Sequence, residues 1–326
     1  MNRKGENMKL TIAITFWDKD QNNIPKLLNN IEENVKVEHE VITIDNREDT
    51  TTKLSFTPTY SFGYNARQFN ARKKALELAK GEFIWFIDGD DEIMELNSIS
   101  DHDIQVYQYT SNNMEVHFTE EEIVDFYNTK TFIDSYVPLW NKIFRKSLFD
   151  GFNLEADIIT SEDVIYNLYA IRKAKSYKRF SKTIYHQNVG NSNNFAIDNV
   201  DVIHNVFYGY EKSIQLIKEL SGAIEFHALE YQIFSYFMGM INKCTSEETV
   251  LALLDYLFKF FDSERINKHF IEFTYCGGFR SETIKPIFNY LKEHYPQYEW
   301  QKYIEVEYTM FDGSTKKEKR PLFDID

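Results

Sequence analysis

The fold is decided by the stretch NARQFNARKKALELAKGEFIWFIDGDD, which runs from Asn65 to Asp91. Its first part, Asn65 to Lys80, has apolar residues at helical spacing and predicts a helix. Gly81 then ends that helix, because glycine adopts the left-handed cap without a Cβ penalty. The next segment, Glu82 to Ile87, is short and apolar and predicts a buried strand. That strand delivers the acidic run Asp88 to Asp91 to its carboxyl end.

A strand-helix-strand unit precedes this stretch. The segment LTIAITF, Leu10 to Phe16, is apolar and β-branched, as in a strand that is covered on both faces. Ile24 to Ile31 has helical spacing, and His39 to Ile44 predicts a second strand that ends next to Asp45. A right-handed crossover makes the two strands parallel, so their carboxyl ends share the edge where open α/β sheets bind ligands.

The chain beyond this unit first continues the α/β pattern and then changes. Residues 104–119 predict paired strands, and a capping box at Thr119 predicts a helix to about Tyr127. Glu162 and Asp163 open another amphipathic segment. Past residue 200 the sequence predicts three long helices and one strand, at Val202 to Leu220, Ile224 to Ile241, Glu247 to Phe261 and Tyr303 to Met310. We therefore expect an α/β domain over 8–200 and a mainly helical domain over 201–326.

Composition excludes several classes of protein. The 326 residues include 37 basic and 51 acidic side chains, a net charge of −14, with 43% hydrophobic residues. Such a chain is globular, and its charge argues against a nucleic-acid partner. Two cysteines are too few for a disulfide framework and indicate a reducing compartment. We find no signal peptide at Met1 to Lys9 and no apolar run that could span a membrane, so we expect a cytoplasmic protein.

The acidic run after the third strand needs a compensating charge. Three carboxylates within four residues repel one another, and burial penalises each of them. Mg²⁺ or Mn²⁺ is the natural counterion, and Asp88 and Asp90 in D-x-D order can face one ion or one sugar diphosphate. The alternative is a solvated turn, in which Asp and Gly are common.

The stretch from Asn65 to Asp91 closely resembles the helix, glycine, strand and D-x-D-D end of family 2 glycosyltransferases of GT-A type. Other landmarks follow in the order of that family, namely Leu10 to Phe16, Val41 to Asp45, WNKIFRKSLF at Trp140 to Phe149, Ser161-Glu162-Asp163, and Tyr185-His186. The resemblance covers roughly residues 8 to 195. It implies a GT-A type α/β fold, a mostly parallel nucleotide-binding sheet flanked by helices, followed by a mainly helical C-terminal domain.

The resemblance also implies roles for individual residues. Asp45 and Arg72 would contact the nucleoside, Asp88 the sugar or ribose, and Asp90 the metal, Mn²⁺ or Mg²⁺. The donor would be a nucleoside diphosphate sugar, with UDP-sugars expected first. His186 is a candidate further metal ligand, because imidazole suits Mn²⁺. After the second strand the family commonly has D-D-G-S, where this chain has Asp45-Asn46-Arg47-Glu48.

Asp163 would be the catalytic base of such an enzyme. A metal-bound diphosphate leaves without a general acid, so one carboxylate that removes the acceptor proton suffices, and in-line attack inverts the anomeric carbon. The acceptor class stays open among glycan, lipid carrier, protein and peptide. The helical last third could bind the acceptor, form a homo-oligomer, or simply pack its own aromatic residues.

Two other hypotheses fit parts of the sequence. FIDGDD also has the D-x-D of Mg²⁺-dependent phosphotransferases of haloacid-dehalogenase type, although that motif usually lies on the first strand and here lies on the third. A non-catalytic protein that keeps the pocket for binding a nucleotide sugar is the other alternative. Release of nucleoside diphosphate separates an enzyme from such a binding protein.

Overall fold

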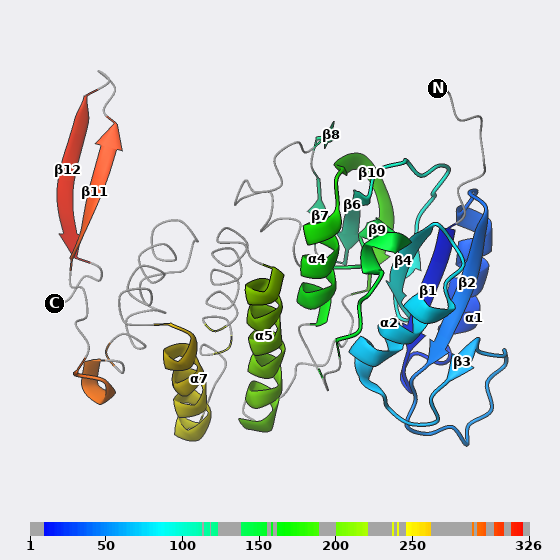
Figure 1. Ribbon diagram of the computed structural model, residues 1–326, viewed down its shortest axis with the longest axis horizontal. Helices are drawn as coiled ribbons and strands as arrows, with labels where there is room; N and C mark the ends of the chain where they lie inside the picture. The colour runs from blue at the N-terminus through cyan, green and yellow to red at the C-terminus, as the bar shows by residue number, and fades with distance from the viewer. Residues whose placement is uncertain are drawn as a thin grey trace. The chain divides into compact units, whose positions relative to one another are not determined.

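The computed structural model describes most of the chain and divides it into two compact units. The described residues are 10–112, 114–117, 119–122, 138–154, 158, 162–188, 200–220, 237, 240, 246–261, 289, 292–297, 303–309 and 314–321. The first unit comprises residues 1–194 with 205–228, and the second comprises 195–204 with 229–326. Figure 1 shows the elements of both in chain order.

The first unit is built on one mixed sheet. Its strands among the described residues are β1 (Leu10–Phe16), β2 (His39–Asp45), β3 (Tyr60–Ser61), β4 (Phe83–Asp88), β5 (Glu92–Ile93), β6 (Ile104–Ser111), β7 (Met114–Val116), β8 (Glu121–Glu122), β9 (Lys142–Arg145) and β10 (Tyr177–Gln187). Their order is β3-β2-β1-β4-β9-β6-β10-β5, while β7 pairs with β6 and β8 with β10. The long ladders, β1 with β2, β1 with β4 and β6 with β10, are parallel, and the antiparallel ladders are short. The predicted α/β fold with a mostly parallel sheet is thus confirmed.

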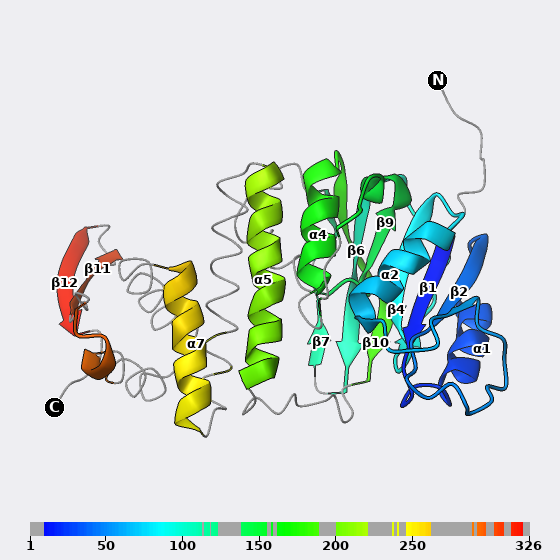
Figure 2. The same ribbon diagram turned by 60° about the horizontal axis from the view of Figure 1, so that its bottom comes forward.

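Helices cover both faces of this sheet. They are α1 (Ile24–Asn34), α2 (Arg67–Leu78) and α4 (Glu162–Lys173), with a 3-10 turn η1 at Lys146–Phe149. Alternate β1 residues from Leu10 to Phe16 pack in one core with the buried face of α1. Thr15, on the other face of β1, accepts a hydrogen bond from Gln68 of α2. Because strand side chains alternate, α1 and α2 lie on opposite faces (Figure 2).

An aromatic cluster fixes α4 beside α2. Tyr166 of α4 packs its ring 5.5 Å from that of Phe69 and 5.7 Å from that of Phe86. Its hydroxyl donates a hydrogen bond of 2.8 Å to the Phe69 carbonyl. The partnered hydroxyl allows a buried tyrosine to join two helices and a strand without an unsatisfied polar group. This packing brings the first turn of α4 close to Arg72.

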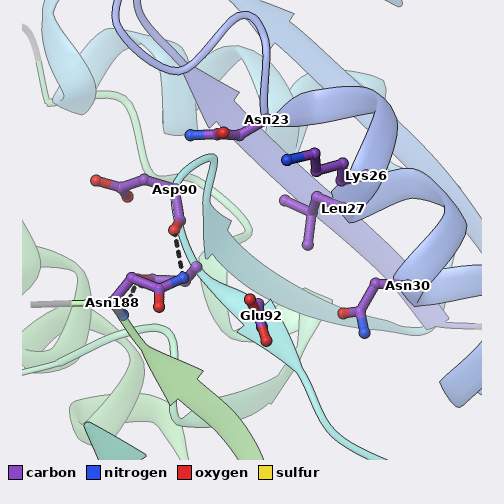
Figure 3. Close-up of a pocket in the computed structure, with 8 residues that line it drawn as sticks. Asn23, Lys26, Leu27, Asn30, Asp90, Glu92 and Asn188 are labelled. Carbon is purple, nitrogen blue, oxygen red and sulfur yellow. Dashed lines mark hydrogen bonds between the residues drawn. The ribbon is translucent and has the colours of Figure 1, made fainter. Parts of the chain in front are cut away.

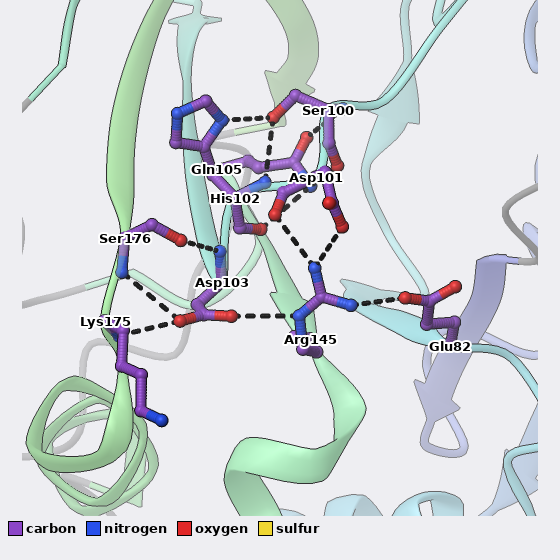
Figure 4. A network of polar contacts seen from close by, with 9 residues as sticks. All are labelled: Glu82, Ser100, Asp101, His102, Asp103, Gln105, Arg145, Lys175 and Ser176. Carbon is purple, nitrogen blue, oxygen red and sulfur yellow. Dashed lines mark hydrogen bonds and ion pairs between the residues drawn. The ribbon is translucent and has the colours of Figure 1, made fainter. Parts of the chain in front are cut away.

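The edge of the sheet at the amino ends of β4, β6 and β10 is held by Arg145. Its guanidinium contacts the carboxylates of Glu82, Asp101 and Asp103, the last at 2.9 Å (Figure 4). Asp103 also accepts the backbone N–H groups of Lys175 and Ser176. Burial alone would raise the pKa of Asp103, but these N–H groups and Arg145 lower it. The network ties four strands together at the edge opposite the acidic run.

One sequence prediction in this unit is wrong. The expected helix from Thr119 begins instead with the short strand β8, in which Glu121 and Glu122 pair with Arg179 and Lys178 of β10. Arg179 Nη1 lies 3.2 Å from Glu121, so opposite charges on neighbouring strands favour the sheet here. The rest of the expected helix, to Tyr127, lies outside the described residues.

The second unit contains helical segments and a hairpin. Helix α5 comprises Val200–Leu220, and α7 (Glu247–Phe260) is capped by Ser246, which accepts the Thr249 N–H. Strands β11 (Tyr303–Thr309) and β12 (Thr315–Pro321) pair antiparallel. The helices predicted from Val202 and Glu247 and the strand from Tyr303 are confirmed, while most of the helix predicted over 224–241 lies outside the described residues. No described helix is long and apolar enough to cross a bilayer.

Candidate functional site

The carboxyl ends of β1, β2 and β4 meet at one edge of the sheet. Phe16, the last residue of β1, is paired with Asp45 of β2, and Thr15 is paired with Asp88 of β4. The edge predicted from the sequence therefore exists, with an acidic residue on each side of the central strand.

Arg72 joins this edge to the first turn of α4. Its Nη2 lies 3.0 Å from Asp88 Oδ1, and its Nη1 lies 3.0 Å from Glu162 Oε1. Nη1 also contacts Asp163 Oδ1. Gln68, one helical turn before Arg72, donates a second hydrogen bond to Asp88 at 3.0 Å. The structure thus brings together three of the predicted site residues, Arg72, Asp88 and Asp163.

The charges in this cluster depend on one another. Burial by itself would lower the pKa of Arg72. The neighbouring carboxylates of Asp163, Asp88 and Glu162 outweigh this effect, so the pKa of Arg72 is raised overall. Burial raises the pKa of Glu162 to about 7, helped by Asp163 and opposed by Arg72. Burial also raises the pKa of Asp88, and Arg72 opposes this change. One guanidinium therefore compensates three carboxylates that would otherwise repel one another.

The turn after β4 is held in place by its backbone and by Asp91. A Cβ at Gly89 would lie 2.9 Å from both Ile24 Cδ1 and Phe16 Cβ, so the turn approaches β1 and α1 too closely for another residue. Asp91 is buried and accepts hydrogen bonds from the Tyr185 hydroxyl at 2.5 Å and the Asn188 N–H at 2.8 Å. Burial raises the pKa of Asp91 to about 7. Asp91 is an anchor for the turn.

Asp90 has a different environment, because its side chain is 34% exposed and lies 3.4 Å from Lys19 Nζ. It also lines a cavity of about 480 Å³ beside the turn. The polar residues that line this cavity are Asn23, Lys26, Asn30, Asp90, Asp91, Glu92 and Asn188. Figure 3 shows that those it labels come from α1 and its N-cap on one side, and from the turn, β5 and the residue after β10 on the other.

Asp90 fits a cation that is shared with a substrate. Among the described residues no group of three His, Cys, Asp or Glu side chains could hold a metal ion. Mg²⁺ and Mn²⁺ are commonly held by one or two carboxylates together with water and phosphate oxygens. An accessible carboxylate at a turn suits such a cation.

Asp45 is engaged by its own loop. Arg47 forms a bidentate pair with it, at 2.9 Å from Nε and 3.0 Å from Nη2, and the Ser61 hydroxyl donates to it at 3.1 Å. Both charged side chains are less than 5% exposed. In this arrangement the Asp45 carboxylate positions Arg47 and the loop, and nucleoside contact by Asp45 stays a prediction.

His186 is also hydrogen-bonded. Its Nε2 donates to Asn112 Oδ1 at 3.2 Å, and Nδ1 lies 2.8 Å from the Thr110 hydroxyl. With Glu92 it lines a second cavity, of about 490 Å³, that does not include Asp90. Metal binding by His186 would require one ring nitrogen to leave its present partner, and it stays a prediction.

The loop before α2 holds a strained residue. Arg67 has φ of 68°, a left-handed conformation that costs an arginine roughly 1–2 kcal/mol. Two asparagine side chains impose it: Asn46 Oδ1 accepts the Ala66 N–H at 2.7 Å, and Asn65 Oδ1 accepts the Arg67 N–H at 3.0 Å. Asn46 directly follows β2, so the strain is stored at the same edge of the sheet.

Several contacts within the site are not predicted from the sequence. Gln68, Arg47 and Tyr185 each bind one of the edge carboxylates, and Trp17 donates a hydrogen bond from Nε1 to Gln68 at 3.1 Å. Lys142 is fully buried, and burial lowers its pKa to about 7. The three contacts arise from the fold, so no local pattern marks them, whereas Lys142 lies within the WNKIFRKSLF landmark.

Known structures share this fold. The chain matches a crystal structure of S. aureus TarS 1-349 with a TM-score of 0.63 and 17% identity, over 98% of this chain and 100% of that one. The same TarS region in complex with UDP-GlcNAc matches with a TM-score of 0.62 and 18% identity, over 95% and 97% of the two chains. A longer TarS structure matches at 0.59 and 16% identity, with 95% of this chain covering 60% of that one. No family model and no curated protein matches the sequence. The fold is therefore that of TarS.

Proposed function

We propose that this chain is a metal-dependent inverting glycosyltransferase that uses a nucleoside diphosphate sugar, a UDP-sugar in the first instance. The observation that carries the proposal is the Arg72 guanidinium, which joins Asp88 of the D-x-D-D turn to Asp163 of α4. The acidic turn and the acidic pair thus lie at one sheet edge, where α/β folds bind ligands. The shared fold of TarS, which has been crystallised with UDP-GlcNAc, supports this donor class.

Each residue has a separate task in this proposal. Asp90 would hold Mn²⁺ or Mg²⁺ together with the donor diphosphate, and Asp88 would contact the sugar or the ribose. The bound cation would offset the negative charge that develops on the leaving diphosphate. Arg72 was expected to contact the nucleoside, but its observed contacts favour a positioning role, since its two terminal nitrogens hold Asp88 and Asp163.

Asp163 is the proposed base. Its side chain is 25% exposed, and Arg72 contacts Oδ1, so Oδ2 is the oxygen proposed to meet the acceptor. The acceptor nucleophile gives its proton to Asp163, forms a bond to the anomeric carbon and displaces the diphosphate from the opposite side, which inverts the configuration. Ion pairing with Arg72 keeps the carboxylate in the required orientation.

The acceptor and the domain roles are broader proposals. A glycan, lipid carrier, protein or peptide with a hydroxyl or another nucleophile would serve as acceptor. Residues 8–200 would form the catalytic domain, and residues 201–326 would bind the acceptor or form a homo-oligomer.

Calorimetric titration with UDP-GlcNAc, with and without Mn²⁺, tests the donor site. We expect binding that needs Mn²⁺, followed by release of UDP when an acceptor or water is available. Binding without UDP release for any acceptor would instead support the non-catalytic nucleotide-sugar binding protein. No binding of UDP or any UDP-sugar would contradict the proposed donor class.

A further inference from the structure

Three cations at the acidic edge, Lys19, Arg47 and Arg72, are already paired with carboxylates. Arg72 contacts Asp88, Glu162 and Asp163, and Lys19 lies 3.4 Å from Asp90. Arg47 makes its bidentate pair with Asp45. A donor diphosphate brought to this edge would meet several negative side chains, so it needs a positive group whose charge is not already compensated.

Arg67 has such a charge. Its backbone N–H is bonded to Asn65, while its half-buried guanidinium has no hydrogen bond or ion pair with any residue that the structure describes. A guanidinium presents several donors in a planar fork that matches phosphate oxygens.

Its neighbours place Arg67 at the donor edge. Two positions before Arg67, the Oδ1 atom of Asn65 accepts a hydrogen bond of 3.4 Å from Nδ2 of Asn46, which follows β2. The following residue, Gln68, contacts Thr15 of β1 and Asp88 of β4. The Arg67 backbone therefore lies between two side chains that reach the carboxyl ends of the three strands.

The backbone conformation supplies an independent observation. Arg67 is the non-glycine residue with positive φ in the described chain, whereas glycine would take the same φ without strain. Strained non-glycine residues persist where the surroundings hold them, and they cluster at ligand sites. Glycine would avoid the strain at this position but would lack the guanidinium, so the guanidinium is what the strained residue adds to the site.

We propose that Arg67 binds the diphosphate of the donor and is a determinant of donor affinity. The inference rests on the proposed function, because it assumes a nucleoside diphosphate at this edge. It predicts that glycine at position 67 relieves the backbone strain and at the same time weakens the binding of diphosphates.

The test is a calorimetric titration of UDP and of uridine, both with Mn²⁺, into the full chain and its variants. For Arg67→Gly we expect about tenfold weaker UDP binding, unchanged uridine binding, and a melting temperature equal to or above that of the parent. Arg67→Asn, which also tolerates left-handed φ, should behave like glycine, and Arg67→Lys should retain part of the UDP affinity. Lys74→Ala, which removes a positive charge from the same helix, should leave UDP binding unchanged.

The outcomes separate the two proposals. If the parent binds UDP and Arg67→Gly binds it within twofold, the role of Arg67 is wrong while the donor site stands. Equal losses for UDP and uridine would also overturn it, because the contact would then not be with phosphate. If the parent binds no UDP, both the donor proposal and this one fail.

Discussion

The guanidinium of Arg72 lies 3.0 Å from the carboxylate of Asp88 and, through its other terminal nitrogen, contacts Asp163. One side chain on α2 thus sets the relative positions of a carboxylate at the end of β4 and another in the first turn of α4. Because Arg72 is itself buried, this contact is central to both stability and the proposed chemistry.

Replacement of Arg72 should destabilise the fold. Arg72→Met removes the guanidinium that pairs with Asp88, Glu162 and Asp163 together, and an unpaired buried charge costs about 3–5 kcal/mol. Arg72→Lys keeps the charge and should lose less. Urea denaturation at pH 7.5 measures both changes.

Arg145→Met is the matched control, because Arg145 also contacts three acidic side chains but lies at the opposite edge of the sheet. It should lower stability without changing UDP affinity. A loss below 1 kcal/mol for Arg72→Met would show that the observed contacts do not compensate the buried carboxylates.

Asp90 should control the metal dependence of donor binding. Asp90→Asn removes the accessible carboxylate charge. The ratio of UDP affinity with Mn²⁺ to UDP affinity without it should therefore fall at least tenfold. Its stability should change little, since the pair with Lys19 is partly exposed and such pairs contribute about 0–1 kcal/mol. Titrations of UDP with and without Mn²⁺ check this. An unchanged effect of Mn²⁺ would exclude Asp90 as a ligand.

Asp91 should give stability an unusual pH dependence. Burial raises its pKa from the ordinary 3.8 to about 7, so the folded state binds the proton more tightly than the unfolded chain. Its contribution therefore disfavours folding increasingly as the pH rises from about 4 to 7, by roughly 2–4 kcal/mol. Asp91→Asn should remove this component, which denaturation at pH 5, 6, 7 and 8 would detect as a different slope. Parallel stability curves for the parent and the variant would contradict the raised pKa.

Much of the fold follows from local sequence pattern. The strand over Leu10 to Phe16 is recognisable because it is apolar and β-branched, and its parallel pairing with the strand that ends at Asp45 follows from crossover handedness. The grouping of Asp88 with Asp163 was expected from the family resemblance, and the Arg72 contacts agree with it.

The remaining features depend on contacts that no local pattern specifies. The pairing of Asp45 with Arg47 depends on the backbone of the loop, and the bond from Tyr185 to Asp91 joins positions 94 residues apart. At β8, cross-strand charge pairing outweighed a sequence that favours the start of a helix. The strain at Arg67 depends on two asparagine side chains, one of them on another strand end.

The most direct test of the proposed glycosyl transfer compares Asp163→Asn with the parent chain. The affinity for UDP-GlcNAc and the rate of UDP release are both measured at the same Mn²⁺ concentration. We predict donor affinity within about threefold of the parent and UDP release lowered by roughly 10²–10⁴-fold, the contribution of a positioned base. Release at the parental rate would show that Asp163 is not the base and would contradict the proposed mechanism.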